Sequence, residues 1–190
     1  MTYDEAIYAL SKHKFTPAIA VFLGHLAYNP EDGEAWMHLG IAYTEAGFQQ
    51  EALEALHRAE IYSEESAELC EALGCAYLRL DEVKLARHYL EDALLLPECP
   101  ASAFRNLGVL LLQLGETKSA EALIEIALYG NPDDAQTLYA HVLLLEEKAR
   151  RGDDAARSRL SEALEDILRR PAAPPAIRSG ASRRLAALNR

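Results

Sequence analysis

The sequence contains few of the residues that favour β-sheets. Among its 190 residues, Val and Ile together number only 12, whereas Ala and Leu number 33 and 31. β-branched side chains favour strands and unbranched side chains favour helices, so a mainly β fold is excluded. Half of the residues are apolar, which is enough for a substantial core and argues against a disordered chain.

Cysteine is also scarce, with an odd set of three and no CxxC pair: Cys70, Cys75 and Cys99. This spacing argues against a disulfide framework and against a zinc site. The first residues lack the basic start and apolar stretch of a secretory signal, and no apolar run approaches the roughly 18 residues of a membrane span. We therefore expect a soluble, cytoplasmic protein that does not insert into a membrane.

Basic residues are too few to balance the acidic ones. The chain has 30 acidic and 19 basic residues and a net charge of −11, which disfavours nucleic acid as a partner because phosphate backbones are repelled. The imbalance is uneven, since residues 1–168 carry a net charge of −17 while residues 169–190 carry six arginines and no acid.

Motifs of catalysis are absent as well. The sequence has no HExxH, GxSxG, phosphate-binding GxxxxGK[ST] or GxGxxG pattern. Its six histidines do not cluster at metal-ligand spacing. We therefore predict a protein that is not an enzyme, with no catalytic residues, no metal ligands and no cofactor.

Internal repetition dominates what is present. A glycine recurs every 34 residues, at Gly40, Gly74 and Gly108. Small residues follow it by twelve and by 19 positions, with a larger residue between them: Ala52, Leu56 and Ala59 in the first unit, Ala86, Leu90 and Ala93 in the second, and Ala120, Ile124 and Ala127 in the third. Glycine at such a position permits the close approach of a second helix.

The fullest unit reads Trp36-x-x-Leu39-Gly40-x-x-Tyr43. Its large residues are three and four apart and so share one face of a helix; Trp36 is interpreted as packing within its repeat. Gly47 and Gly115 stand where the turn between the two helices is expected, with Asp81 in the middle unit. The period and pattern resemble the tetratricopeptide repeat family.

The resemblance implies an all-α fold, a right-handed superhelical solenoid of four to five antiparallel helix pairs. Three units are well defined and two are degenerate, within a repeat domain over 1–170: strong repeats at 33–66, 67–100 and 101–134, and end repeats at 1–32 and 135–170. The first helix of the last unit should be about one turn longer than the others.

Residues 171–190 form a proline-containing spacer and a basic tail. Ser182 to Asn189 is expected to form a short helix. We expect this tail to dock on the last repeat near Leu160 and Leu164, with a disordered, solubilising end as the alternative.

In this family the first helix of each pair lines a concave groove, and the resemblance places the following residues there: Tyr3, Ile7, Leu10, Met37, His38, Ile41, Thr44, Glu71, Cys75, Leu78, Arg105, Asn106, Val109, Leu112, Tyr139 and Leu143. The groove is apolar along most of its length, which is typical of an interaction site; burial of these residues by a neighbouring helix or by the tail is the alternative. Arg105 beside Asn106 is the best candidate for anchoring a carboxylate or backbone group.

The resemblance implies a protein-protein interaction adaptor that binds a protein or peptide segment. Two alternatives stay open. Small acidic repeat proteins that act as chaperones of exported proteins look similar, and a structural subunit could self-assemble into a homo-oligomer through its terminal repeats.

Overall fold

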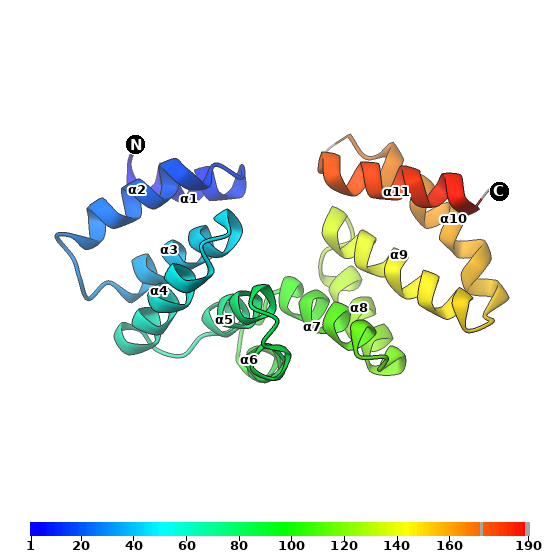
Figure 1. Ribbon diagram of the computed structural model, residues 1–190, viewed down its shortest axis with the longest axis horizontal. Helices are drawn as coiled ribbons and strands as arrows, with labels where there is room; N and C mark the ends of the chain where they lie inside the picture. The colour runs from blue at the N-terminus through cyan, green and yellow to red at the C-terminus, as the bar shows by residue number, and fades with distance from the viewer. Residues whose placement is uncertain (172, 189–190) are drawn as a thin grey trace. The chain divides into compact units, whose positions relative to one another are not determined.

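The computed structural model describes residues 1–171 and 173–188, which form eleven α-helices and no strand. Contacts between residues divide the chain into unit 1 (Met1–Cys99) and unit 2 (Pro100–Arg190) (Figure 1). Unit 1 contains α1 (Tyr3–Ser11), α2 (Phe15–Leu26), α3 (Gly33–Ala46), α4 (Gln49–Tyr62), α5 (Ala67–Arg79) and α6 (Val83–Leu95). Unit 2 contains α7 (Ala101–Gln113), α8 (Thr117–Gly130), α9 (Ala135–Arg150), α10 (Asp154–Arg169) and α11 (Pro175–Leu188).

The helices form five pairs followed by a single C-terminal helix, as the repeat pattern predicts. The first helices of the last four pairs begin at residues 33, 67, 101 and 135. Helix α9 has 16 residues, whereas α3, α5 and α7 have 13 or 14. The prediction that the first helix of the last pair is longer than the others is therefore confirmed. No helix within the described residues is long and apolar enough to cross a membrane.

The recurring glycines are required by close helix contact within each pair. A Cβ atom on these glycines would lie 2.5 Å from Leu56 Cγ at Gly40, 2.6 Å from Leu90 Cγ at Gly74 and 2.8 Å from Ile124 Cγ1 at Gly108. All three contacted side chains are fully buried. The close approach predicted from the repeat is therefore confirmed in each strong unit.

The turn within each pair uses a left-handed residue. The predicted Gly47 and Gly115 have φ angles of 86° and 81°, and Asp81 adopts 61° in the equivalent place. His13 (φ 56°) occupies this place in the first pair and Gly152 (φ 96°) in the last. His13, Gly47, Asp81 and Gly115 follow one another at intervals of 34 residues, so the turn geometry repeats even where the glycine is missing.

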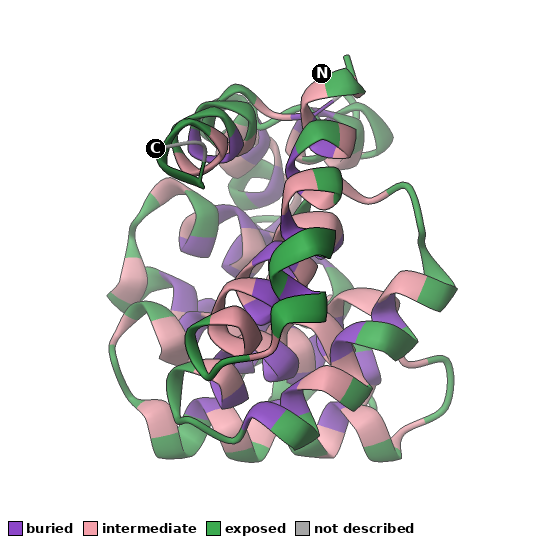
Figure 2. Cartoon of the chain, turned by 90° about the vertical axis from the view of Figure 1, so that its right-hand side faces the viewer, coloured by how far each residue is buried: buried purple, intermediate pink, exposed green. Residues whose placement is uncertain are grey.

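Each helix buries one side against its neighbours, and buried positions alternate with exposed ones along the ribbon (Figure 2). In the degenerate first pair, Ala18 and Phe22 are fully buried. These residues share a cluster with Leu39 of α3, so the first pair is packed onto the first strong repeat.

The C-terminal helix begins earlier than the expected Ser182 and docks on the last pair. Helix α11 starts at Pro175, whose fixed φ suits the first helical position. Ala181 of α11 is fully buried, and Ile177 and Leu185 pack against the cluster that contains Leu160 and Leu164. The expected docking of the tail is thus confirmed, while Asn189 lies outside the described residues.

Candidate functional site

The first helices of successive pairs lie next to each other within each unit. In unit 1, the Tyr3 hydroxyl of α1 is 3.1 Å from Nδ1 of His38 in α3, and Arg79 of α5 pairs with Glu45 of α3 at 3.4 Å. In unit 2, the equivalent helices α7 and α9 are joined at the N-cap of α9. Each unit therefore presents its own surface of first helices.

We name the predicted residues on α1, α3 and α5 the unit 1 face, and those on α7 and α9 the unit 2 face. On the unit 1 face, Ile7, Leu10, Ile41 and Leu78 are partly exposed. Ile7 and Leu10 rest on the buried cluster of the first pair, and Ile41 rests on the cluster of the next repeat. Their inner sides stabilise the core while their outer sides remain open to solvent.

Two predicted face residues are instead part of the core, which corrects the prediction for them. Met37 is 9% exposed and packs with Leu56 and Leu73. Thr44 is 4% exposed, and its hydroxyl donates a hydrogen bond of 2.9 Å to the carbonyl of Gly40. Helix α5 packs against α3, and Met37 and Thr44 keep too little exposed surface to form much contact with a partner.

A cluster of rings forms the end of the unit 1 face near the N-terminus. Tyr3 contacts Phe22 and His25 with ring centroids 5.3 and 4.9 Å apart, and Phe22 stacks on His38 at 5.7 Å. Burial lowers the pKa of His38 and raises that of Tyr3. Both side chains are therefore uncharged near neutral pH. His25 Nε2 is 2.7 Å from the Asp32 carboxylate, which also caps α3.

The remaining unit 1 candidates are half-buried: Glu71 and Cys75. The neighbouring Cys70 is buried, and this burial raises the pKa of its thiol to about 11. Cys70 is therefore protonated and a poor nucleophile at neutral pH.

Arg105, the predicted anchor, already has an internal partner. Its Nη1 donates a hydrogen bond of 2.8 Å to Asp134, and its Nε donates to the Asn106 side chain at 3.2 Å. Burial alone would raise the pKa of Asp134, but hydrogen bonds from Thr137 and the charge of Arg105 lower it. Asp134 therefore holds the guanidinium of Arg105 between α7 and α9, and the anchoring of a partner by Arg105 stays a prediction.

On the unit 2 face, Val109, Leu112 and Leu143 are partly exposed. Val109 and Leu112 rest on the buried cluster that contains Ile124. Tyr139 is covered in part by α11, which corrects its assignment as an open face residue. Its hydroxyl would be 3.0 Å from a Cβ on Gly180, and the Arg184 guanidinium lies 5.1 Å from the centre of its ring.

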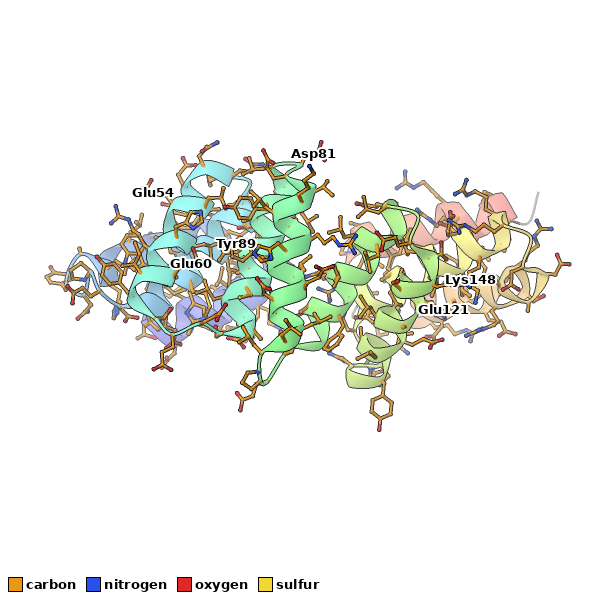
Figure 3. The ribbon with its side chains drawn as sticks, turned by 90° about the horizontal axis from the view of Figure 1, so that it is seen from below. Glu54, Glu60, Asp81, Tyr89, Glu121 and Lys148 are labelled. Atoms are coloured by element: carbon orange, nitrogen blue, oxygen red, sulfur yellow. The ribbon has the colours of Figure 1, made fainter. Side chains whose placement is uncertain are left out.

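A polar network that the sequence did not reveal links the second helices α4 and α6 to the first helix α5. His57 of α4 is 2.6 Å from Glu60 and 3.2 Å from the Tyr77 hydroxyl, and Tyr89 donates a hydrogen bond of 3.3 Å to Glu60 (Figure 3). Burial raises the pKa of Tyr77 and raises that of Tyr89 to about 12. Because both hydroxyls stay protonated, the network is suited to linking α4, α5 and α6 and not to nucleophilic chemistry.

A similar link joins two pairs in unit 2, where Lys148 of α9 donates a hydrogen bond of 2.5 Å to Glu121 of α8 (Figure 3). Across the described residues, no group of three His, Cys, Asp or Glu side chains is placed to hold a metal ion.

Comparisons with known proteins agree with the repeat geometry. A sequence model described as Tetratricopeptide repeat matches residues 3–66 and 71–135, which is more than half of the chain. A search of curated proteins gives no match.

Solved structures also resemble this chain. A thermophilic TPR protein of Thermus thermophilus is 20% identical, with a TM-score of 0.80 over 97% of both chains. MamA is 28% identical, with a TM-score of 0.64 over 84% of this chain and 92% of its own. YrrB, a TPR protein with an unusual peptide-binding site, is 21% identical, with a TM-score of 0.59 over 95% of this chain and 90% of its own. The fold is therefore an all-α helical repeat solenoid, and the chain belongs to the tetratricopeptide repeat family.

Proposed function

We propose that this protein is a non-enzymatic adaptor that binds a segment of a partner protein on its first helices. The observation that carries the proposal is the row of apolar side chains on adjacent first helices in each unit, including Ile7, Ile41 and Leu78 in unit 1 and Leu143 in unit 2. These residues keep part of their surface exposed although the core beneath them is complete. Apolar side chains that stay exposed on a folded protein contribute favourable free energy when a partner covers them.

The proposal places the protein in a reducing compartment, the cytoplasm, because its three cysteines are an odd number without a CxxC pair, which argues against a disulfide framework. Family membership supports a binding role, since proteins of this fold bind peptides or proteins, and YrrB has a peptide-binding site of its own.

The test compares full-length variants by affinity capture from the native cell and mass spectrometry. Leu78→Asp and Leu143→Asp place a charge on the two faces, and Leu95→Asp on α6 is the matched control because Leu95 is 83% exposed. We expect the face variants to lose the captured partner while keeping the wild-type melting temperature, and the control to retain it. Retention of the partner by both face variants would contradict the proposal.

The same experiment distinguishes the two alternatives. Capture of a single exported protein in a fixed ratio to this chain would indicate a chaperone of exported proteins. Capture of further copies of this chain alone would indicate a self-assembling structural subunit.

A further inference from the structure

The two units differ sharply in charge. Unit 1 contains 18 acidic and six basic residues, whereas unit 2 contains 12 acidic and 13 basic residues. The apolar surfaces of the two units therefore offer different electrostatic environments to a partner.

On the unit 1 face, negative charge lies along one edge of the apolar row, in the first turns of the first helices. Asp4, Glu34 and Glu68 stand in the first turns of α1, α3 and α5 and are exposed. Glu34 and Glu68 both lie close enough to His38 for their charges to favour its protonated form, and Asp4 and Glu34 act on Tyr3 in the same way. Each of the three carboxylates thus lies near His38, Tyr3 or both, at the edge of the face.

These carboxylates are not neutralised by the chain itself. Within residues 1–171 and 173–188, no basic side chain forms an ion pair with Asp4, Glu34 or Glu68. Elsewhere in unit 1, ion pairs do form, as between Glu45 and Arg79 and between Glu91 and Arg87. The face consequently keeps a concentrated negative charge beside exposed apolar carbon.

Favourable interaction with the helix dipole does not account for these acids by itself. The first helices of unit 2 have no acidic residue in their first turns. Ser102 and Gln136 occupy the positions that Glu34 and Glu68 hold in unit 1. A first helix of this protein therefore forms without an acid at that position, and the acids of unit 1 are available to select a partner.

We infer that the unit 1 face binds a protein segment that carries Lys or Arg side chains beside apolar ones. This inference rests on the proposed function and specifies the chemistry of its partner. Opposite charges at an interface raise the association rate and exclude wrong partners, so an acidic or nucleic-acid ligand is rejected at this surface.

The geometry also sets the spacing within that segment. Ile41 follows Glu34 by seven residues and Leu78 follows Glu68 by ten, which corresponds to about 10–15 Å along the helix axis. An extended chain advances about 3.3 Å per residue. A basic and an apolar side chain of the segment should therefore lie about three to five residues apart.

The test selects short peptides from a random library on the full-length protein and measures their affinities. We expect enrichment of Lys or Arg with large apolar residues at that spacing. Glu34→Gln combined with Glu68→Gln should weaken binding about three- to tenfold, as expected for two exposed ion pairs, and higher salt should reduce the difference.

The matched control is Glu51→Gln combined with Glu64→Gln, which removes the same charge from two exposed residues outside the first helices. We expect its effect to stay below about twofold. Equal weakening by both pairs, or selected peptides without basic residues, would overturn the inference. Leu78→Asp separates this failure from that of the proposed function: binders that tolerate Leu78→Asp, or no binders at all, would count against the first-helix surface itself.

Discussion

Gly74 of α5 and Leu90 of α6 are packed so closely that a single added carbon cannot fit between their helices without movement. A Cβ on Gly74 would lie 2.6 Å from Cγ and 3.0 Å from Cδ2 of Leu90, which is fully buried. The same relationship joins Gly40 to Leu56 and Gly108 to Ile124. The close contact of the two helices in each strong repeat therefore depends on the glycine.

Gly74→Ala should destabilise the protein by about 1–3 kcal/mol because Leu90 must leave its position in a packed core. Gly24→Ala is the matched control, since nothing lies within 4 Å of a Cβ on Gly24. This second change should stabilise α2 by about 0.5–1 kcal/mol through the loss of backbone freedom in the unfolded chain. Urea unfolding measures both, and equal effects of the two substitutions would contradict the close-packing argument.

His13 and Asp81 each adopt a left-handed backbone conformation at the turn within their helix pair, although neither is a glycine. This conformation costs an L-residue about 1–2 kcal/mol. Glycine avoids that strain but loses more backbone entropy on folding, so the net gain in stability from glycine is smaller than the strain itself. We expect His13→Gly and Asp81→Gly to stabilise the protein by about 0.5 kcal/mol each.

Ala122→Gly, at an exposed position in the interior of α8, is the control for these turn substitutions and should destabilise the protein by about 1 kcal/mol. Loss of stability in both turn variants, measured by thermal unfolding, would show that the side chains of His13 and Asp81 outweigh the strain.

The repeat could be located from the sequence because it is a property of local spacing. Each of the three strong helix pairs brings a glycine of its first helix against a large residue of its second, and this contact recurs at a period of 34 residues. The starts of the first helices followed directly from that period. The pattern also carried the left-handed turn residues, including Asp81, which the sequence placed at the turn without a glycine.

Which face residues are accessible could not be predicted, because accessibility depends on the neighbouring helix. Met37 and Ile41 both belong to the predicted face, yet only Ile41 keeps exposed surface once α5 packs against α3. The pairing of Arg105 with Asp134 was equally hidden, since the two residues are 29 positions apart. Long-range polar partners of this kind carry no periodic signal in one sequence.

Stability should fall on mild acidification because of His38 and His141. Burial lowers the pKa of both imidazoles, and in His141 the charges of Arg159 and Lys148 add to the effect. Around His38, the nearby Glu34, Glu68 and Asp32 act in the opposite direction without reversing the shift.

Because the pKa of each histidine is lower in the folded protein than in the unfolded chain, the unfolded chain binds protons at a higher pH than the folded protein does. The stabilisation is therefore complete above the unfolded pKa of about 6.5 and is lost as the pH falls through the folded pKa. His38→Gln combined with His141→Gln should flatten the fall in melting temperature between about pH 7 and pH 5. The exposed His88→Gln is the control, and an unchanged slope in the double variant would refute the assignment.

Arg184 holds the docked C-terminal helix to α9. Arg184 of α11 lies with its Cζ 5.1 Å from the centre of the Tyr139 ring, and its Nε is 2.8 Å from the Glu146 carboxylate of α9. The neighbouring Arg183 is exposed and donates a hydrogen bond of 3.4 Å to the carbonyl of Ser179 within its own helix. Arg184→Ala should therefore destabilise by about 1 kcal/mol, whereas Arg183→Ala, with the same loss of charge, should have almost no effect.

Truncation after Arg170 should have a larger effect than either point change, because it removes the apolar contacts of α11 as well. Ile177, Ala181 and Leu185 would no longer cover the cluster around Leu164, so the truncated protein should melt at a lower temperature and bind more of an apolar-sensitive dye. Tighter binding of a partner by the truncated protein would indicate in addition that α11 restricts access to the unit 2 face around Tyr139. An unchanged melting temperature and unchanged dye binding would show that α11 does not stabilise the last pair, and the argument from its buried contacts would then be wrong.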